Sequence, residues 1–98
     1  MDEIKANLDA DGRVIRCSAK LKKRLYAVRY IAEKFEADRE YTEQEVNEII
    51  KNWVLFSDYV LIRREMIDYA FMSRRRDGTG YRRADELPDV QMIIDGLQ

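Results

Sequence analysis

The stretch from Arg74 to Arg83 constrains the fold most, because it places five arginines and one acid around an Asp-Gly-Thr-Gly turn. Glycines two apart between polar and aromatic residues are typical of the turn of a β-hairpin. We therefore expect strands over residues 71–74 and 80–83. Guanidinium groups on such a ribbon suit phosphate or carboxylate partners. The arginines concerned are Arg74, Arg75, Arg76, Arg82 and Arg83.

Apolar residues recur at helical spacing in three segments that precede this hairpin. The first covers about 18–35, with Ser18 as its cap. The second begins directly after Thr42, and Glu45 completes a capping box with that threonine. The third covers about 58–70. Three helices followed by a hairpin predict an α+β fold that is winged helix-turn-helix-like, with the hairpin as a two-stranded wing.

Shorter elements flank this predicted body. Residues 13–17 alternate well enough for an extra N-terminal strand, and 39–41 suit a very short one. After Pro88, apolar residues recur at near-helical spacing and predict an acidic, amphipathic C-terminal tail helix. We expect residues 1–83 to form the winged-helix-like domain with its N-terminal strand. Residues 84–98 should pack on that domain or on a partner.

Charge is segregated along the chain. The formal net charge is -1, yet residues 13–34 sum to +7 and residues 63–83 to +4, with acidic segments between them. This pattern favours a binding protein with a defined basic face. Cys17 is the only cysteine and histidine is absent, so an intrachain disulfide, a thiolate zinc cluster and imidazole ligands are excluded. We expect no metal, no cofactor, no membrane segment and a cytoplasmic location.

One arginine of the third helix, Arg63, falls inside that helix's apolar arc. A guanidinium there needs a partner, and we expect a structural ion pair with Glu45 on the second helix. Glu45, Asn47 and Arg63 together have the composition of a polar active site, but a helix cap, a backbone contact and this ion pair account for them. No nucleophile with an adjacent base and no phosphate-cradling glycine loop accompanies them, so we predict no enzyme.

Two tyrosines, Tyr26 and Tyr30, lie one turn apart on the first helix, on a face rich in lysine and arginine. Solvent is expected on that face, so something should cover the two rings. The apolar face of the tail is the natural cover, either within one chain or across a homodimer. Tyr26 and Tyr30 are therefore our predicted interaction residues.

The favoured function is nucleic-acid binding, mainly through phosphate contacts from the wing. Arg64 is the cation expected on the solvent face of the third helix, beside Glu65 and Asp68, so base readout in the major groove is disfavoured. The alternative is a non-enzymatic protein-interaction or dimerisation module that binds an acidic or apolar protein surface. A small-molecule sensor is a weaker third hypothesis, because the aromatic residues that it needs are expected to fill the core. Those residues are Trp53, Phe56, Tyr59 and Phe71.

Four stretches of the sequence carry a family resemblance: residues 22–25, 41–47, 61–68 and 76–81. Together they resemble the bacterial family known as domain of unknown function 2087, over about residues 13–83. The resemblance implies a winged-helix-like domain associated with transcription regulators, in a family with no established ligand or activity. Two residues depart from the family pattern. Ser18 stands where a proline is expected, and Arg82 stands where an aromatic residue commonly follows the tyrosine.

Overall fold

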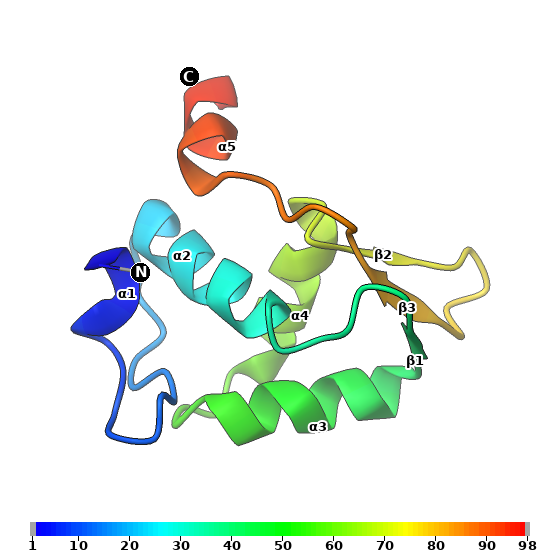
Figure 1. The fold of residues 1–98 in the computed structure, drawn as a ribbon, viewed down its shortest axis with the longest axis horizontal. Coiled ribbons are helices and arrows are strands. Elements are labelled where there is room, and N and C mark those ends of the chain that lie inside the picture. The colour runs from blue at the N-terminus through cyan, green and yellow to red at the C-terminus, as the bar shows by residue number, and fades with distance from the viewer. Residues whose placement is uncertain (1, 98) are drawn as a thin grey trace.

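The computed structural model of the protein describes residues 2–97. In that part of the chain, five helices and a small three-stranded antiparallel sheet form an α+β fold (Figure 1), which confirms the α+β part of the prediction. In chain order, the elements are α1 (Asp2–Lys5), α2 (Leu21–Ala32), β1 (Glu40–Tyr41), α3 (Glu43–Trp53), α4 (Tyr59–Asp68), β2 (Met72–Arg74), β3 (Tyr81–Arg83) and α5 (Val90–Gly96).

The core lies where α2, α3 and α4 meet, with the hairpin closing one end. Its fully buried side chains are mostly aliphatic, and they come from all three helices together with aromatic rings from the loops and the sheet. Phe35 and Tyr41 pack edge to face with ring centroids 5.1 Å apart, which joins the loop after α2 to β1. The largest members are Tyr81, Phe35, Phe71, Leu25, Ile31, Ile50, Ile62 and Met66.

Of the three body helices α2, α3 and α4, the last two begin at the caps that the sequence predicts. At α3 the Thr42 hydroxyl accepts from the Glu45 backbone and the Glu45 carboxylate accepts from the Thr42 backbone, so the predicted capping box is confirmed. At α4, the Asp58 carboxylate accepts from the Leu61 backbone. Ser18 does not cap α2. Its hydroxyl accepts from the backbone of Lys20 instead, and Lys20 takes the N-cap position, two residues later than predicted.

The predicted hairpin is present as β2 and β3. Ser73 faces Arg82 in the antiparallel register, and Arg74 faces Tyr81. The turn between the strands is held by Asp77, whose carboxylate accepts from both the backbone and the hydroxyl of Thr79. The short strand β1 pairs with the other edge of β3, which gives the sheet order β1-β3-β2.

The predicted N-terminal strand over residues 13–17 is not formed. Val14 makes isolated bridges to Leu8 and Val54 only, and a short helix, α1, precedes this segment. A strand requires a partner that stays extended over several residues, and both partners here are loop segments. The side chain of Asn7 then takes the place of a second ladder step, by bonding the backbone N–H and C=O of Arg16.

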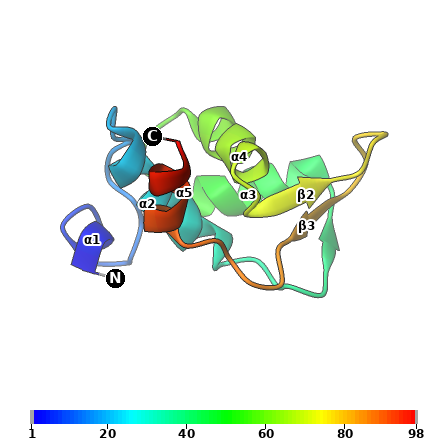
Figure 2. The same cartoon turned by 90° about the horizontal axis from the view of Figure 1, so that it is seen from above.

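The tail forms the helix α5, which lies beside α2 in both Figure 1 and Figure 2. Val90 is buried, and the Arg29 guanidinium of α2 donates to the Pro88 carbonyl at 3.1 Å. Asp89 caps the helix by accepting from the Met92 backbone. None of the helices described here has the length and apolar character needed to cross a membrane.

Candidate functional site

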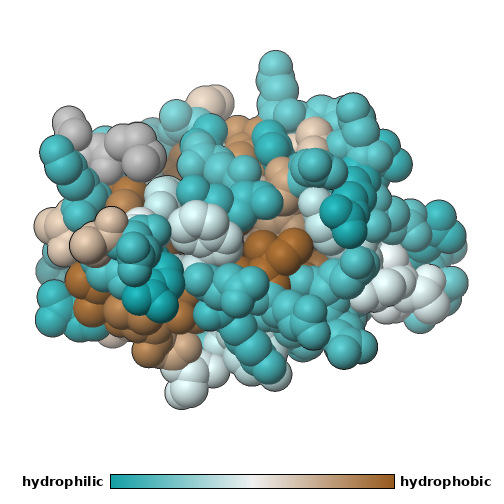
Figure 3. Space-filling view, turned by 60° about the horizontal axis from the view of Figure 1, so that its bottom comes forward, coloured by the Kyte–Doolittle hydropathy of each residue, from teal (hydrophilic) through white to brown (hydrophobic). Residues whose placement is uncertain are grey.

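Four exposed arginines lie on α4 and the hairpin. Within residues 2–97, none of the four forms an ion pair with a carboxylate. In Figure 3, the end of the molecule that carries the hairpin, at the right, is hydrophilic, and hydrophobic side chains gather toward the centre and the opposite end. The hairpin and α4 therefore present unneutralised positive charge to solvent. These arginines are Arg64, Arg74, Arg76 and Arg82.

Two of the predicted wing arginines are used within the fold instead. The Arg75 guanidinium lies 2.9 Å from a carboxylate oxygen of Glu40 on β1. Glu40 reaches it across Gly80, where an added Cβ would lie 2.5 Å from the Glu40 carboxylate. Arg83 donates to the Phe35 carbonyl at 3.1 Å and ties the end of β3 to the end of α2. The predicted basic wing therefore offers three available arginines rather than five.

The predicted Glu45–Arg63 ion pair is wrong. Arg63 donates to the side-chain oxygen of Asn47, and its Nε lies 4.0 Å from Glu43. Glu43 and Asn47 are four residues apart and so share the face of α3 that meets α4, whereas Glu45 lies on another face. The two carboxylate oxygens of Glu45 are occupied by the Thr42 backbone and by Arg39. The pKa of Glu45 is lowered, mainly by the hydrogen bond that its carboxylate accepts from the Thr42 backbone.

Tyr81 connects this polar group to the hairpin. Its hydroxyl donates to Glu43 at 2.7 Å, although its ring is only 1% exposed. That hydrogen bond is the main cause that lowers the pKa of Glu43, and Arg63 acts in the same direction. Burial raises the pKa of Tyr81. The α3, α4 and β3 surfaces are therefore fixed to one another at the base of the hairpin.

A depression of about 320 Å³ opens between α4 and the hairpin, directly above this network. Three guanidinium groups and one carboxylate face it, and apolar side chains and the Tyr81 ring complete its wall. Because the exposed Arg64 and Arg74 belong to opposite sides of it, the helix and the hairpin both supply charge. The lining residues are Val60, Arg63, Arg64, Ile67, Asp68, Arg74 and Tyr81.

A buried ion pair between Arg24 and Glu65 was missed by the sequence reasoning. The two side chains form a bidentate contact of 2.6 and 2.8 Å, and they are 15% and 7% exposed. Glu65 was expected on the solvent face of α4, but it points toward α2. The signal was present in the spacing, because Glu65 follows Ile62 by three residues and so borders the apolar arc. The solvent face of α4 therefore carries one carboxylate fewer than predicted.

The two predicted interaction tyrosines have different environments. Tyr30 is 7% exposed, donates to the Gly12 carbonyl and packs edge to face on Trp53 with ring centroids 6.4 Å apart. It is covered by the N-terminal turn rather than by the tail. Tyr26 is half-buried, and both tyrosines line a hollow to which α5 contributes Val90 and α1 contributes Ile4. The tail thus adjoins this pair of rings, while the main hydrogen bond and ring contact of Tyr30 are with Gly12 and Trp53.

The aromatic residues considered for a small-molecule sensor line neither the depression between α4 and the hairpin nor the two hollows beside α1. Phe71 is fully buried, and the other three are half-buried and pack against the core. Lys51 lies over the ring of Tyr59, with its Nζ 4.4 Å from the ring centroid. Trp53 contacts Tyr30 and Lys34 instead of a cavity. These four side chains account for core packing and surface cation–π contacts.

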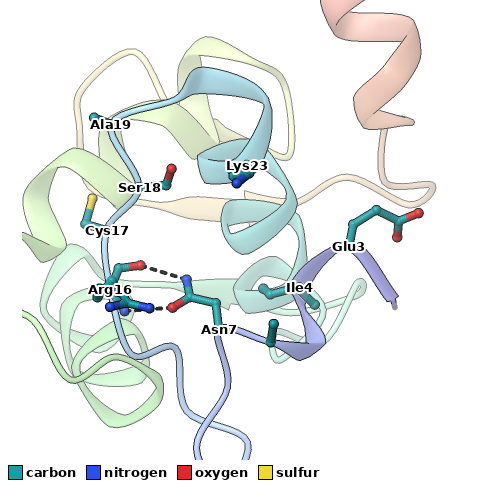
Figure 4. Close-up of a pocket in the computed structure, with 9 residues that line it drawn as sticks. Glu3, Ile4, Asn7, Arg16, Cys17, Ser18, Ala19 and Lys23 are labelled. Atoms are coloured by element: carbon teal, nitrogen blue, oxygen red, sulfur yellow. Dashed lines mark hydrogen bonds between the residues drawn. The ribbon is translucent and has the colours of Figure 1, made fainter.

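A second hollow, of about 430 Å³, lies between α1 and the segment that leads into α2 (Figure 4). Lys23 and Arg16 supply positive charge to its lining, and Glu3 of α1 is also a lining residue. Burial raises the pKa of Cys17, so its thiol stays protonated at neutral pH. This hollow therefore combines mixed charge with an unactivated thiol.

A bacterial family described as an uncharacterized protein conserved in bacteria, domain of unknown function 2087, matches residues 13–83. The chain belongs to this family. The matched residues of the chain run from the segment around Val14 to the end of β3. They therefore include both α4 and the hairpin of β2 and β3. No curated protein and no solved structure matches the chain.

Proposed function

We propose that this chain is a non-enzymatic, winged-helix domain with a transcription-linked role, which binds nucleic acid mainly through phosphate contacts. The observation that carries the proposal is the set of exposed arginines on α4 and the hairpin that form no ion pair with a carboxylate of the described residues. Guanidinium groups that are not neutralised by the protein's own carboxylates are available to bind phosphate oxygens in pairs. In the winged-helix assignment, α4 is the helix after the turn and β2 and β3 form the wing.

Phosphate contacts are favoured over base contacts on this surface. The solvent face of α4 carries Arg64 and Asp68, and it lacks the second arginine, asparagine or glutamine that would read a base edge. Glu65, which would repel phosphates on that face, is instead buried against Arg24. Binding should therefore depend strongly on salt and weakly on sequence.

A fluorescence-anisotropy titration with a labelled DNA duplex at several salt concentrations tests this proposal. Changing Arg64, Arg74, Arg76 and Arg82 together to glutamine should weaken binding about a hundredfold at low salt, because up to four phosphate contacts are lost. The slope of log K against log salt should fall by about 0.9 for each contact removed. Absence of binding by the unchanged chain at low salt contradicts the proposal.

A matched control removes the same number of charges from the other basic stretch. Arg16, Lys20, Lys22 and Lys23 are also exposed, and changing all four to glutamine gives the same net charge. If the arginine surface is the binding site, this control should retain affinity within about threefold, because it alters only the long-range field. Equal losses in both variants would show that net charge, and not this surface, governs binding.

A second function, self-association through α5, is favoured by one observation. Met92 of α5 is 73% exposed and Leu97, directly after α5, is 58% exposed, whereas the other apolar residues of this helix pack against the core. Sedimentation of the full chain across a range of concentrations tests it. A concentration-dependent dimer that is lost on changing Met92 and Leu97 to glutamate would support this function, and a monomer throughout would contradict it.

A further inference from the structure

The depression between α4 and the hairpin suggests how a nucleic-acid strand is seated, which deepens the proposed function and rests on it. We propose that this depression holds one sugar–phosphate unit of a nucleic-acid backbone. The phosphate would lie between Arg64 and Arg74, and the sugar against Val60 and Ile67.

The charge of the depression favours an anion. Three guanidinium groups line it, and the two carboxylates in or beside its wall are Asp68 and Glu43. Glu43 is already engaged by the Tyr81 hydroxyl and lies 4.0 Å from Arg63. Arg74 interacts with the Tyr81 hydroxyl, but like Arg64 it is exposed and forms no ion pair with a carboxylate of the described residues. The two guanidinium groups face the depression from opposite sides, in a position to bind the same phosphate from two directions.

The base of the depression is held in place before any ligand binds. Arg63 is tied to Asn47, and Tyr81 is tied to Glu43, so side chains from α3, α4 and β3 are fixed to one another. The wall therefore needs little rearrangement when a ligand enters, which reduces the entropic cost of binding. Only the two exposed arginines have to become ordered.

The size and the apolar part of the depression indicate more than a bare phosphate. Its volume of about 320 Å³ is several times that of one phosphate group, and part of its wall comes from the aliphatic side chains Val60 and Ile67. Val60 is 37% exposed, in the first turn of α4. A pentose attached to the phosphate would cover these side chains and remove apolar surface from water.

The surroundings favour a continuous strand over a free nucleotide. Beyond Arg74, the exposed Arg76 continues the positive charge toward the turn, whereas Arg82 pairs with Ser73 and so lies on the other face of the hairpin. A free nucleotide would leave Arg76 unused, whereas a strand places a further phosphate near it. In this proposal, the depression binds one phosphate of the strand, and the hairpin arginine beyond it binds a neighbouring phosphate. We call this series of phosphate positions the track.

Two single substitutions test the depression, each with a matched control. Val60→Asp puts a carboxylate into its apolar wall, at a position in the first helical turn where an acidic residue is tolerated. Its control is Leu55→Asp, which changes another exposed apolar residue outside the lining. Arg74→Gln removes one of the two available guanidinium groups, and its control is Arg16→Gln. Circular dichroism verifies that all four variants keep the helical fold.

The probes are a fluorescein-labelled DNA duplex, a labelled single strand and free adenosine monophosphate. We expect Val60→Asp and Arg74→Gln each to weaken binding of the duplex or the single strand about fivefold, and Arg74→Gln to reduce the salt slope by about 0.7–0.9. Both controls should bind within about twofold of the unchanged chain. Adenosine monophosphate should bind at least about a hundredfold more weakly than either strand, since it fills one position of the track.

Three results would overturn the inference. Unchanged affinity of Val60→Asp and Arg74→Gln, in a chain that binds DNA, removes the depression from the binding surface and leaves the proposed function standing. Tight binding of adenosine monophosphate that Val60→Asp abolishes would make the site a nucleotide pocket rather than part of a strand track. Absence of binding to any strand by the unchanged chain removes the proposed function itself, and the inference with it.

Discussion

The two basic stretches of the chain, 13–34 and 63–83, use their cations in different ways. In the first stretch, Arg24 is buried in an ion pair with Glu65, and Lys34 lies over two aromatic rings. The cations that remain exposed there lie near the start of α2, and Lys23 shares a hollow with Glu3. In the second stretch, the exposed cations are all arginines on α4 and the hairpin, and two of them, Arg64 and Arg74, line one depression.

This difference shows that the net charge of a segment does not locate a binding surface. The stretch with the larger formal charge, +7, holds the most deeply buried cation, and the stretch of +4 carries the arginines arranged for shared phosphate contacts. The distinguishing property is whether a guanidinium group is neutralised by a neighbour from another element. Substitutions that separate structural from available cations can therefore break or sharpen the comparison.

The largest effect is expected at the buried ion pair. Arg24→Met should lower the free energy of unfolding by about 3–5 kcal/mol, because it leaves the Glu65 carboxylate buried without a partner. Urea denaturation followed by circular dichroism measures it. The matched change Arg64→Met, on exposed α4 surface, should stay within about 0.5 kcal/mol. Equal stability losses in both variants would contradict the division between structural and available cations.

A smaller effect is expected at Lys34. Its ammonium group lies 4.3 Å from the Tyr30 ring centroid and 4.2 Å from that of Trp53. Lys34→Gln should therefore lower the free energy of unfolding by about 1 kcal/mol. Lys23→Gln, in the same stretch and without such a contact, should change stability by less than about 0.5 kcal/mol. If Lys23→Gln proves the more damaging, the exposed lysines of α2 have a structural role as well.

A still smaller effect is expected at Asp68, the exposed carboxylate that faces the depression. Asp68→Asn should tighten DNA binding about two- to threefold at low salt, because it removes a charge that repels phosphate, and the gain should vanish at high salt. Anisotropy titrations at two salt concentrations measure it. Weaker binding by this variant would mean that Asp68 orients a ligand or an arginine rather than opposing the phosphates.

The acid dependence of stability should reflect Glu43, which anchors the hairpin through Tyr81. Since its pKa is lowered in the folded chain, the unfolded chain binds more protons in the acid range, and stability should rise with pH there. The contribution is present above the unfolded pKa and is lost as pH falls through the folded one, below about pH 5. Urea titrations between about pH 3 and 6 should show a shallower dependence for Glu43→Gln than for the exposed control Glu48→Gln. Parallel curves would contradict this role.

Features encoded within a few residues were predictable from the sequence. The Thr42–Glu45 capping box and the Asp77–Gly80 turn depend on local backbone geometry, and both are found where the pattern placed them. The absence of the predicted strand over 13–17 could not be foreseen from the sequence, because a strand there depends on whether a distant segment stays extended beside it.

Pairings between elements were harder to predict for a related reason. A change of one or two residues along a helix rotates a side chain by about 100–200°. To select Glu43 rather than Glu45 as the carboxylate near Arg63, one needs the rotation of α3 against α4. The partner of Glu65 required knowledge of which helix packs against the opposite side of α4. The arginines of the hairpin were found from the sequence, but their availability was set by Glu40 and by the end of α2.

Amide chemical-shift mapping by NMR, with a DNA duplex added at low salt, tests the central claim most directly. If the α4–hairpin arginines form the binding surface, the largest shifts should fall on residues 60–68 and 72–83. Amides of residues 16–23, in the other basic stretch, should change little. Shifts concentrated on residues 16–23, or no shifts anywhere, would contradict the claim.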